Sequence, residues 1–326
     1  MKSLDAHLLR MLRASPVHLL PGDLAAQLGA PFADVEHAIA GLIAAGFDIE
    51  QKPGLGCRLL RSPDRLIADD LHSRLKDCAL AREILVFAET NSTNDVALRL
   101  GRSGHPGGVA IFAERQTAGR GRFGREWDSA DHAGLWFSLL LRPAWPVAEW
   151  MRLTTWAGVA VAEVLGAIAP ARLKWPNDVL IGGKKVAGIL IESATDDAGQ
   201  LFAVAGIGVN VNQPEFPHSL VQTAGSLRQF AGEEVDRPAL AAALLRELDA
   251  SLSALPADFR RIVDRARTLS SLLGSWVEMH YGNESFQGIA ESLDAHGQLQ
   301  IRLASGELRT MTAGEVSSRS LAAPAR

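Results

Sequence analysis

Residues 83–270 alternate strand-like apolar runs with runs at helical spacing, and this alternation restricts the possible folds most strongly. Apolar residues recur at helical spacing over residues 153–168 and 239–255, which is typical of helices that cover a core. The other apolar runs are short and are bounded by turn residues, as expected of buried strands. We therefore predict an α/β or α+β domain with helices packed on a sheet. The strand candidates are residues 84–87, 109–113, 135–141, 179–181, 186–191 and 201–209.

Smaller units are predicted on both sides of this body. The first 62 residues contain three helical faces followed by two strand-like runs around a Pro-Gly turn, which indicates a winged helix-turn-helix. The last 56 residues contain short strand-like pieces with glycine-rich turns, which indicate a small β-barrel, and the final six residues are expected to fray. The predicted domains are a winged helix-turn-helix over 1–62, a connector over 63–82, a catalytic domain over 83–270 and a β-barrel over 271–326.

The composition narrows the possible classes of protein. A formal net charge of −4 argues against a chain that coats nucleic acid or a membrane surface, so any nucleic-acid site must be local. Cys57 and Cys78 have no metal-ligand spacing, which favours a reducing cytoplasmic setting without structural zinc. The longest charge-free run, residues 198–214, is rich in Gly, Asn and Gln and is a poor membrane span. No signal peptide and no membrane partner are expected.

The N-terminal module has a weak charge pattern for a DNA reader. Its third helix, residues 32–45, would enter the major groove, yet it holds Asp34, Glu36 and His37 and no Lys or Arg. Residues 1–65 carry seven basic and seven acidic side chains, so a surplus that would neutralise phosphate is missing. A protein-interaction module therefore stays open beside a DNA-binding one. The candidate phosphate contacts are Lys52, Arg58 and Arg61.

A loop between two predicted strands is suited to binding an anion. Residues 119–125 read Gly-Arg-Gly-Arg-Phe-Gly-Arg. Glycine lets backbone N–H groups approach a ligand closely, and arginine offers a rigid donor fork for carboxylate or phosphate. The alternative is a solvated basic connection between strands. Trp127, which follows the loop, either closes over an adenine or anchors the loop in the core.

Three further clusters carry more polar groups than a core needs. The first cluster follows a strand, precedes a helix predicted to begin near Asp95, and consists of Ser92, Thr93 and Asn94. One of these residues is expected to cap the helix. The other two are available to a polar head group such as a ureido ring. Residues 206–212 place glycines within a strand, which marks a bulge or a close ligand approach.

The third cluster is a turn with charged residues on each side. Pro176 and Asn177 are typical of a turn, but Lys174 and Asp178 bracket them with a cation suited to phosphate and a carboxylate suited to Mg²⁺. Lys185 directly precedes a buried strand, where its ammonium can reach a ligand carboxylate. Cations at these positions are what a reaction between two anions requires.

These blocks, in this order and with these gaps, resemble the signature segments of biotin–protein ligases, and the resemblance covers nearly the whole chain. The N-terminal module and the closing Gly-Glu-Val-Ser-Ser-Arg segment, residues 314–319, resemble the bifunctional bacterial form that also represses biotin synthesis genes. The resemblance implies a class II synthetase-like mixed-sheet catalytic domain, a C-terminal SH3-like β-barrel, and a homodimer formed through a sheet edge.

The implied activity is the attachment of biotin to a lysine of the biotin carboxyl carrier domain of acetyl-CoA carboxylase. ATP and Mg²⁺ are the implied cofactors, biotinyl-5′-AMP is the intermediate, and biotin doubles as co-repressor on operator DNA. The resemblance also implies that the Arg/Gly loop closes over the intermediate and protects it from water.

The resemblance assigns a role to each residue of the clusters. The implied biotin-binding residues are Ser92, Thr93, Asn94, Gln116, Arg120, Gly121, Arg122 and Lys185. The implied ATP-binding residues are Arg120, Arg122, Trp127, Lys174, Asn177, Asp178 and Asn210. Arg120, Arg122 and Lys185 are the implied catalytic residues, and Asp178 is the implied Mg²⁺ ligand.

Some features depart from the family pattern, and more than one function stays open. Asp128 follows Trp127 where relatives often have an aromatic side chain, so adenine stacking is weaker or comes from elsewhere. A lipoate or octanoate ligase shares the fold and the adenylation chemistry. A DNA-binding biotin sensor without ligase activity also stays open, as does RNA binding through the Arg/Gly loop.

Overall fold

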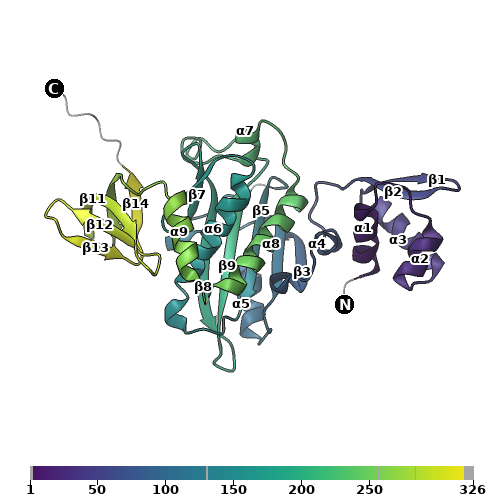
Figure 1. Ribbon diagram of the computed structural model, residues 1–326, viewed down its shortest axis with the longest axis horizontal. Helices are drawn as coiled ribbons and strands as arrows, with labels where there is room; N and C mark the ends of the chain where they lie inside the picture. Colours follow the sequence, from purple (N-terminus) through teal and green to yellow (C-terminus); the bar gives the residue numbers. More distant parts are fainter. Residues whose placement is uncertain (1–2, 130, 256, 283, 319–326) are drawn as a thin grey trace.

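The computed structural model describes residues 3–129, 131–255, 257–282 and 284–318. Figure 1 shows three units in chain order: a small helical unit at the N-terminal end, a central body built on a large sheet, and a small β unit at the C-terminal end. The predicted fraying of the last six residues lies outside the described residues. Among the described helices, none combines the length and apolarity that a bilayer crossing requires.

The N-terminal unit has the predicted winged helix-turn-helix order. Its three helices pack on one apolar core that includes Leu8, Leu24, Val35 and Ile39. A two-stranded antiparallel hairpin, the wing, follows the third helix. The elements are α1 (Leu4–Ala14), α2 (Pro21–Leu28), α3 (Phe32–Ala44), β1 (Asp48–Lys52) and β2 (Gly56–Arg61).

The central body contains a seven-stranded mixed sheet, which confirms the predicted sheet class. Its strand order is β3-β4-β5-β9-β8-β7-β6. Strands β3 and β4 run parallel and are joined through helix α5, whereas the other neighbouring pairs are antiparallel. The strands are β3 (Glu83–Thr90), β4 (Val109–Gln116), β5 (Gly134–Leu141), β6 (Ala171–Lys174), β7 (Asp178–Ile181), β8 (Lys184–Thr195) and β9 (Leu201–Asn210).

Helices cover both faces of this sheet. Along β4, Ala110 and Phe112 join the large core under α6 and α8, while Val109 and Ile111 join a smaller core under α5, because successive side chains point to opposite faces. Figure 1 shows α6, α8 and α9 over one face. The helices of the body and its connector are α4 (Ala68–Arg74), α5 (Thr93–Arg102), α6 (Arg152–Gly166), α7 (Leu227–Ala231), α8 (Arg237–Ala254) and α9 (Phe259–Leu269), with short 3₁₀ turns η1 (Ala79–Ala81), η2 (Arg122–Gly124) and η3 (Val147–Glu149).

The C-terminal unit is a five-stranded antiparallel sheet in the order β13-β12-β11-β10-β14. Alternate residues such as Val277, Met279, Leu299 and Ile301 are buried, as the alternating pattern of the sequence requires. Its strands are β10 (Trp276–Tyr281), β11 (Glu284–Leu293), β12 (Leu299–Leu303), β13 (Leu308–Met311) and β14 (Glu315–Ser318).

Two details of the sequence prediction were wrong. Helix α5 begins at Thr93 rather than near Asp95. The glycines at 206 and 208 do not mark a bulge, because β9 keeps an unbroken register against both β5 and β8. The glycines instead make room for neighbouring side chains, which belong to the candidate site.

A buried arginine joins the connector to the body. Arg237, the first residue of α8, is fully buried and pairs with Glu114 of β4 at 2.7 Å and with Asp64 of the connector at 3.0 Å. The second Glu114 oxygen accepts the backbone N–H of Leu66 at 2.7 Å. The connector is therefore fixed at the strand that leads into the candidate site.

Candidate active site

The predicted polar clusters converge on one pocket at the face of the central sheet. The pocket lies between the start of α5, the end of β4, the Arg/Gly loop and strands β8 and β9. The predicted residues that line it are Ser92, Thr93, Asn94, Gln116, Arg120, Gly121, Arg122, Trp127, Asn177 and Lys185.

The inner end of the pocket is a buried hydrogen-bonded cluster. The Thr93 backbone N–H donates to Gln116 Oε1 at 2.8 Å, and the Ser138 hydroxyl lies 2.7 Å from Thr93 Oγ1 and 2.5 Å from Asn94 Oδ1. Ser92 occupies the N-cap position of α5, but its side chain makes no capping hydrogen bond. One of the residues 92–94 was expected to cap the helix; Ser92 takes the cap position, but its hydroxyl is not used by the cap.

Three glycines of β8 and β9 form the floor of the pocket. A side chain at Gly206 would collide with the Asn94 amide, and Cβ atoms at Gly188 and Gly208 would each lie 2.7 Å from the Trp127 ring. Asn94 and Trp127 thus rest directly on the backbone of the sheet. Side chains of the chain itself approach these strand glycines closely, and the predicted close approach of a ligand stays a prediction.

The Arg/Gly loop is tied to the pocket by ion pairs. Arg120 lies 2.7 Å from Asp95 of α5 and 3.6 Å from Glu192 of β8, and Glu192 also accepts a hydrogen bond from the Asn94 amide at 2.5 Å. Desolvation lowers the pKa of Arg120, but the hydrogen bonds and charges of Asp95 and Glu192 outweigh it and raise the pKa. Arg120 therefore bridges the loop and the head of the pocket.

The next arginines of the loop reach toward the C-terminal unit. Arg122 donates to Asn177 Oδ1 at 3.1 Å and lies 3.5 Å from the Gly314 carbonyl oxygen, while Arg125 pairs with Glu315 at 2.5 Å. Burial lowers the pKa of Arg122, and the carboxylates of Asp178 and Glu315 oppose that shift. The guanidinium stays charged, since arginine titrates far above neutral pH.

Trp127 forms a wall of the pocket. Its ring packs edge-on against Trp136, with centroids 6.2 Å apart, and the Lys185 ammonium lies 4.9 Å from its centroid. This position agrees with the loop-anchor interpretation of Trp127. Contact between Trp127 and an adenine stays a prediction.

Lys185 and Asp178 form an ion pair of 2.8 Å at the outer end of the pocket. Lys185 lines the inner pocket, and both residues, with Lys174 and Trp127, line two adjoining cavities of about 500 and 360 Å³. Phe216 and Leu220 line the larger cavity on its apolar side. The arrangement therefore offers cations and an apolar surface next to the inner pocket.

Asn210 lines the larger cavity but is 5% exposed. Its amide donates to the Gly225 carbonyl oxygen at 3.1 Å, and its Oδ1 accepts from Gln213 at 3.2 Å. Asn210 thus holds the loop after β9 in place, and its contact with ATP stays a prediction. In the part of the chain that is described, no three His, Cys, Asp or Glu side chains cluster as a metal site.

Sequence reasoning missed two residues of the site. Ser138 lies within the apolar run of β5 and Glu192 near the end of β8, where each reads as an ordinary strand residue. For Ser138 the available signal was a hydroxyl within an otherwise apolar strand. This hydroxyl is fully buried, and buried polar groups need partners.

Comparison with known proteins defines the class of protein. Residues 86–212 match the Biotin/lipoate A/B protein ligase family, and residues 272–319 match the Biotin protein ligase C terminal domain. The mixed sheet of the central body is thus the fold of a protein of the biotin/lipoate ligase class.

Individual relatives narrow this class. The bifunctional ligase/repressor BirA of Escherichia coli is 33% identical over 299 residues, which cover 90% of this chain and 90% of that protein. The chain belongs to the biotin protein ligase family. BirA of Bacillus subtilis is 38% identical over 196 residues, 59% of this chain, and the match spans 60% of that relative. The solved biotin protein ligase of Aquifex aeolicus in complex with biotin and ATP superposes with a TM-score of 0.64 at 32% identity, covering 73% of this chain and 99% of that chain.

Proposed function

We propose that the chain is a biotin–[acetyl-CoA-carboxylase] ligase, which joins biotin to a lysine of a carboxylase carrier domain. The main support for this proposal is that one pocket has a polar inner region that continues into a cationic mouth. The inner pocket presents hydroxyl and amide groups, and its mouth presents Arg120, Arg122 and Lys185. The first region suits the ureido ring of biotin, and the second suits its carboxylate beside a phosphate.

The proposed reaction has two steps. A carboxylate oxygen of biotin attacks the α-phosphorus of ATP, and pyrophosphate leaves to give biotinyl-5′-AMP. The neutral amine of the acceptor lysine then attacks the carbonyl carbon of this mixed anhydride, AMP leaves, and an amide forms with loss of a proton. Positioned cations lower the repulsion between the two anions in the first step, which is the role of Arg120, Arg122 and Lys185.

We assign Mg²⁺ to Asp178. Magnesium in nucleotide enzymes is held by one or two carboxylates together with substrate phosphates, so one carboxylate beside Lys174 and Lys185 fits its needs. When bound, Mg²⁺ neutralises phosphate charge. Lys185, paired with Asp178 at 2.8 Å, lies where its ammonium could reach a biotin carboxylate.

We infer that the Arg/Gly loop moves when ligands bind. The inner pocket holds about 50 Å³, whereas sites for drug-sized ligands hold about 300–1,000 Å³. Arg120 lines this space and is held by Asp95 and Glu192, so we expect a ligand to displace Arg120 or the loop. Limited proteolysis near Arg122 should slow with biotin and ATP together; an equal rate with and without them would contradict the inference.

The proposed activity is tested by exchange of labelled pyrophosphate into ATP. We expect exchange that requires biotin and is not supported by lipoate or octanoate. Lys185→Gln should abolish exchange, while Lys184→Gln should retain it, because the neighbouring Lys184 is bonded to the Val221 carbonyl oxygen instead. Exchange with lipoate but not biotin would overturn the proposal in favour of a lipoate ligase.

We further propose that the N-terminal unit binds operator DNA as a biotin-responsive repressor. The winged helix-turn-helix and the names of the BirA relatives support this role. Its charge distribution favours weak binding, because Asp34 and Glu36 lie exposed on α3, and Glu50 pairs with Lys52 and Arg58 of the wing. A gel shift with operator-like DNA, with and without biotin and ATP, tests this role. If no shift occurs in either condition, the repressor role is refuted and only the ligase function remains.

We place the protein in the cytoplasm, where ATP and carboxylases meet, and propose a homodimer through a sheet edge. Strands β3 and β6 are the two edge strands of the central sheet, and an unpaired edge can accept a second strand. The β6 edge is partly covered, because Leu173 bridges to Ser270, so β3 is the edge proposed for the dimer. Sedimentation with and without biotin and ATP measures this assembly, and a monomer under both conditions would contradict it.

A further inference from the structure

The turn between β11 and β12 reaches from the C-terminal unit into the candidate site region. Residues 294–298 form this turn, and the Gly297 carbonyl oxygen accepts a hydrogen bond from Trp175 Nε1 at 3.1 Å. Trp175 lies in the turn between β6 and β7, directly before Pro176, Asn177 and Asp178. A single tryptophan therefore connects the small C-terminal sheet to the charged turn of the body.

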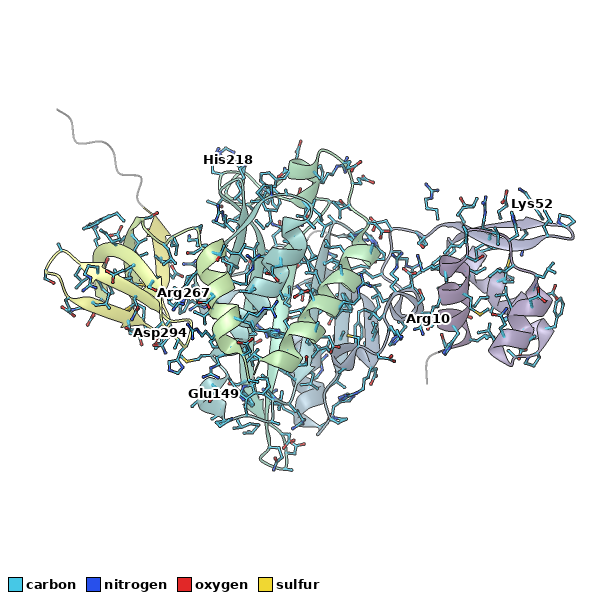
Figure 2. All side chains as sticks on the ribbon, viewed as in Figure 1. Arg10, Lys52, Glu149, His218, Arg267 and Asp294 are labelled. Atoms are coloured by element: carbon cyan, nitrogen blue, oxygen red, sulfur yellow. The ribbon has the colours of Figure 1, made fainter. Side chains whose placement is uncertain are left out.

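The turn is rigid and firmly attached to the body. The Asp294 carboxylate accepts the backbone N–H groups of His296 and Gln298 at 2.8 and 2.9 Å, which closes the turn on itself. Arg267 of α9 donates to the Leu293 carbonyl oxygen, with Nε at 3.0 Å. Figure 2 shows Arg267 and Asp294 close together at the junction of α9 and the C-terminal sheet.

Position 297 favours glycine for two independent reasons. Its backbone has φ of +78°, a region that side chains rarely adopt. A Cβ atom there would also lie 2.7 Å from Thr155 Oγ1 on α6. The absence of a side chain thus lets the turn approach α6 closely enough for its carbonyl to meet Trp175.

The residues after Trp175 hold two of the cations of the site. Asn177 accepts from Arg122 at 3.1 Å, and its amide donates to the Ile189 carbonyl oxygen at 2.9 Å. Asp178 pairs with Lys185 at 2.8 Å. The positions of Arg122 and Lys185 therefore depend on the turn that Trp175 begins.

We propose that Gly297 is a positioning residue for the adenylation step, acting through Trp175 on Arg122 and Lys185. The C-terminal sheet then belongs to the catalytic machinery without contributing a group that touches the reacting atoms. This inference rests on the proposed ligase function. It predicts a larger effect on turnover than on biotin affinity, because Arg122 and Lys185 lie at the mouth of the pocket, whereas its inner end is built from α5, β4 and β5.

The test compares Gly297→Ala with Gly306→Ala. Gly306, in the turn between β12 and β13, has a similar φ of +90° but open space around its Cβ position, so it carries the backbone strain without the contact. We expect Gly297→Ala to lower kcat of biotin-dependent pyrophosphate exchange about tenfold or more, with KM for biotin nearly unchanged, and Gly306→Ala to resemble wild type. Thr155→Ala added to Gly297→Ala should restore much of the loss.

A second measurement needs no activity. Hydrogen–deuterium exchange should rise in peptides covering residues 174–190 for Gly297→Ala and not for Gly306→Ala, because the Ile189 N–H is bonded to the Asn177 carbonyl oxygen. If wild-type protein shows no biotin-dependent exchange of pyrophosphate into ATP, the proposed ligase function is refuted. Two results would overturn the positioning role. One is equal protection of residues 174–190 from deuterium exchange in Gly297→Ala and Gly306→Ala, and the other is an equal kcat of these two variants in an active enzyme.

Discussion

Arg237 and Glu114 form an ion pair of 2.7 Å in which neither side chain is more than 3% exposed. Charges in such a place are costly unless all of their hydrogen-bonding groups are used. Arg237 uses its remaining donors on Asp64 and on the Gly134 carbonyl oxygen, and Glu114 uses its other oxygen on Leu66. The pair thus joins the connector, two strands and α8 at one point.

Loss of this pair should destabilise the whole body. Arg237→Ala leaves Glu114 buried without its main partner, and we expect a decrease of about 3–5 kcal/mol in the free energy of unfolding, measured with urea. Arg246→Ala is the matched control, because that exposed arginine only donates to the Arg74 carbonyl oxygen. A loss below about 1 kcal/mol for Arg237→Ala would show that the buried pair is not required.

Gly208→Ala should disturb Trp127 and with it biotin binding. The new Cβ atom would lie 2.7 Å from the indole ring, and such overpacking costs about 1–3 kcal/mol of folding stability, so we expect Trp127 to shift and biotin binding to weaken. Tryptophan fluorescence and calorimetric titration with biotin measure the two effects. Gly166→Ala, at the end of α6 with open space around its Cβ position, should change neither. Normal affinity in Gly208→Ala would contradict the role given to the floor glycines.

Glu50→Gln should strengthen binding of the N-terminal unit to DNA. Hydrogen bonding to Lys52, with Arg58 and His18 nearby, holds the pKa of Glu50 below its usual value, so this carboxylate neutralises the wing at neutral pH. Its removal frees Lys52 and Arg58 for phosphate, and we expect about a two- to fivefold gain in affinity that shrinks as salt increases. Fluorescence anisotropy with duplex DNA measures it. An identical gain in Glu291→Gln, a change of the same charge on the C-terminal sheet, would contradict a role of the wing.

Asp196→Asn should destabilise the hairpin between β8 and β9 in a pH-dependent way. Hydrogen bonds from the Gln200 and Ala198 N–H groups, together with Arg142, keep the pKa of Asp196 below its usual value of 3.8. A carboxyl whose folded pKa is lowered stabilises the fold above the unfolded pKa and loses that contribution as pH falls. Thermal unfolding should show the variant melting below wild type at pH 7 and approaching it below pH 4. Asp197→Asn is the exposed control, and a gap that persists in acid would refute the argument.

The sequence predicted strands best where apolar runs were uninterrupted. Strands β5 and β9 lie in the middle of the sheet and are buried on both faces, so their apolar runs leave little ambiguity. Strand β6 is an edge strand of four residues with two cations, and α9 carries several arginines along its exposed face; neither was predicted. The secondary structure of short or strongly charged segments depends on the surfaces that they pack against, and the local sequence pattern carries no information about those surfaces.

The residues of the candidate site were likewise predictable only where the signal lies in one contiguous stretch of sequence. Clusters that are contiguous in sequence, such as residues 92–94 and the Arg/Gly loop, were found and do line one pocket. Glu192 and Ser138 were missed because their significance arises only when β8 and β5 are brought against α5. The pairing of Lys185 with Asp178 was likewise unforeseen, since the two residues meet across the β7–β8 pair with a register irregularity between Val179 and Leu180.

The floor of the pocket is bare backbone, because Gly188, Gly206 and Gly208 contribute no side chains. Asn94 and Trp127 lie directly on these glycines, so those two side chains form the surface that a ligand meets there. Discrimination between one carboxylic acid and another must then come from the walls, above all from Asn94 and Trp127. Redesign of the chain for a different acid would therefore begin with those two side chains and leave the strands beneath them untouched.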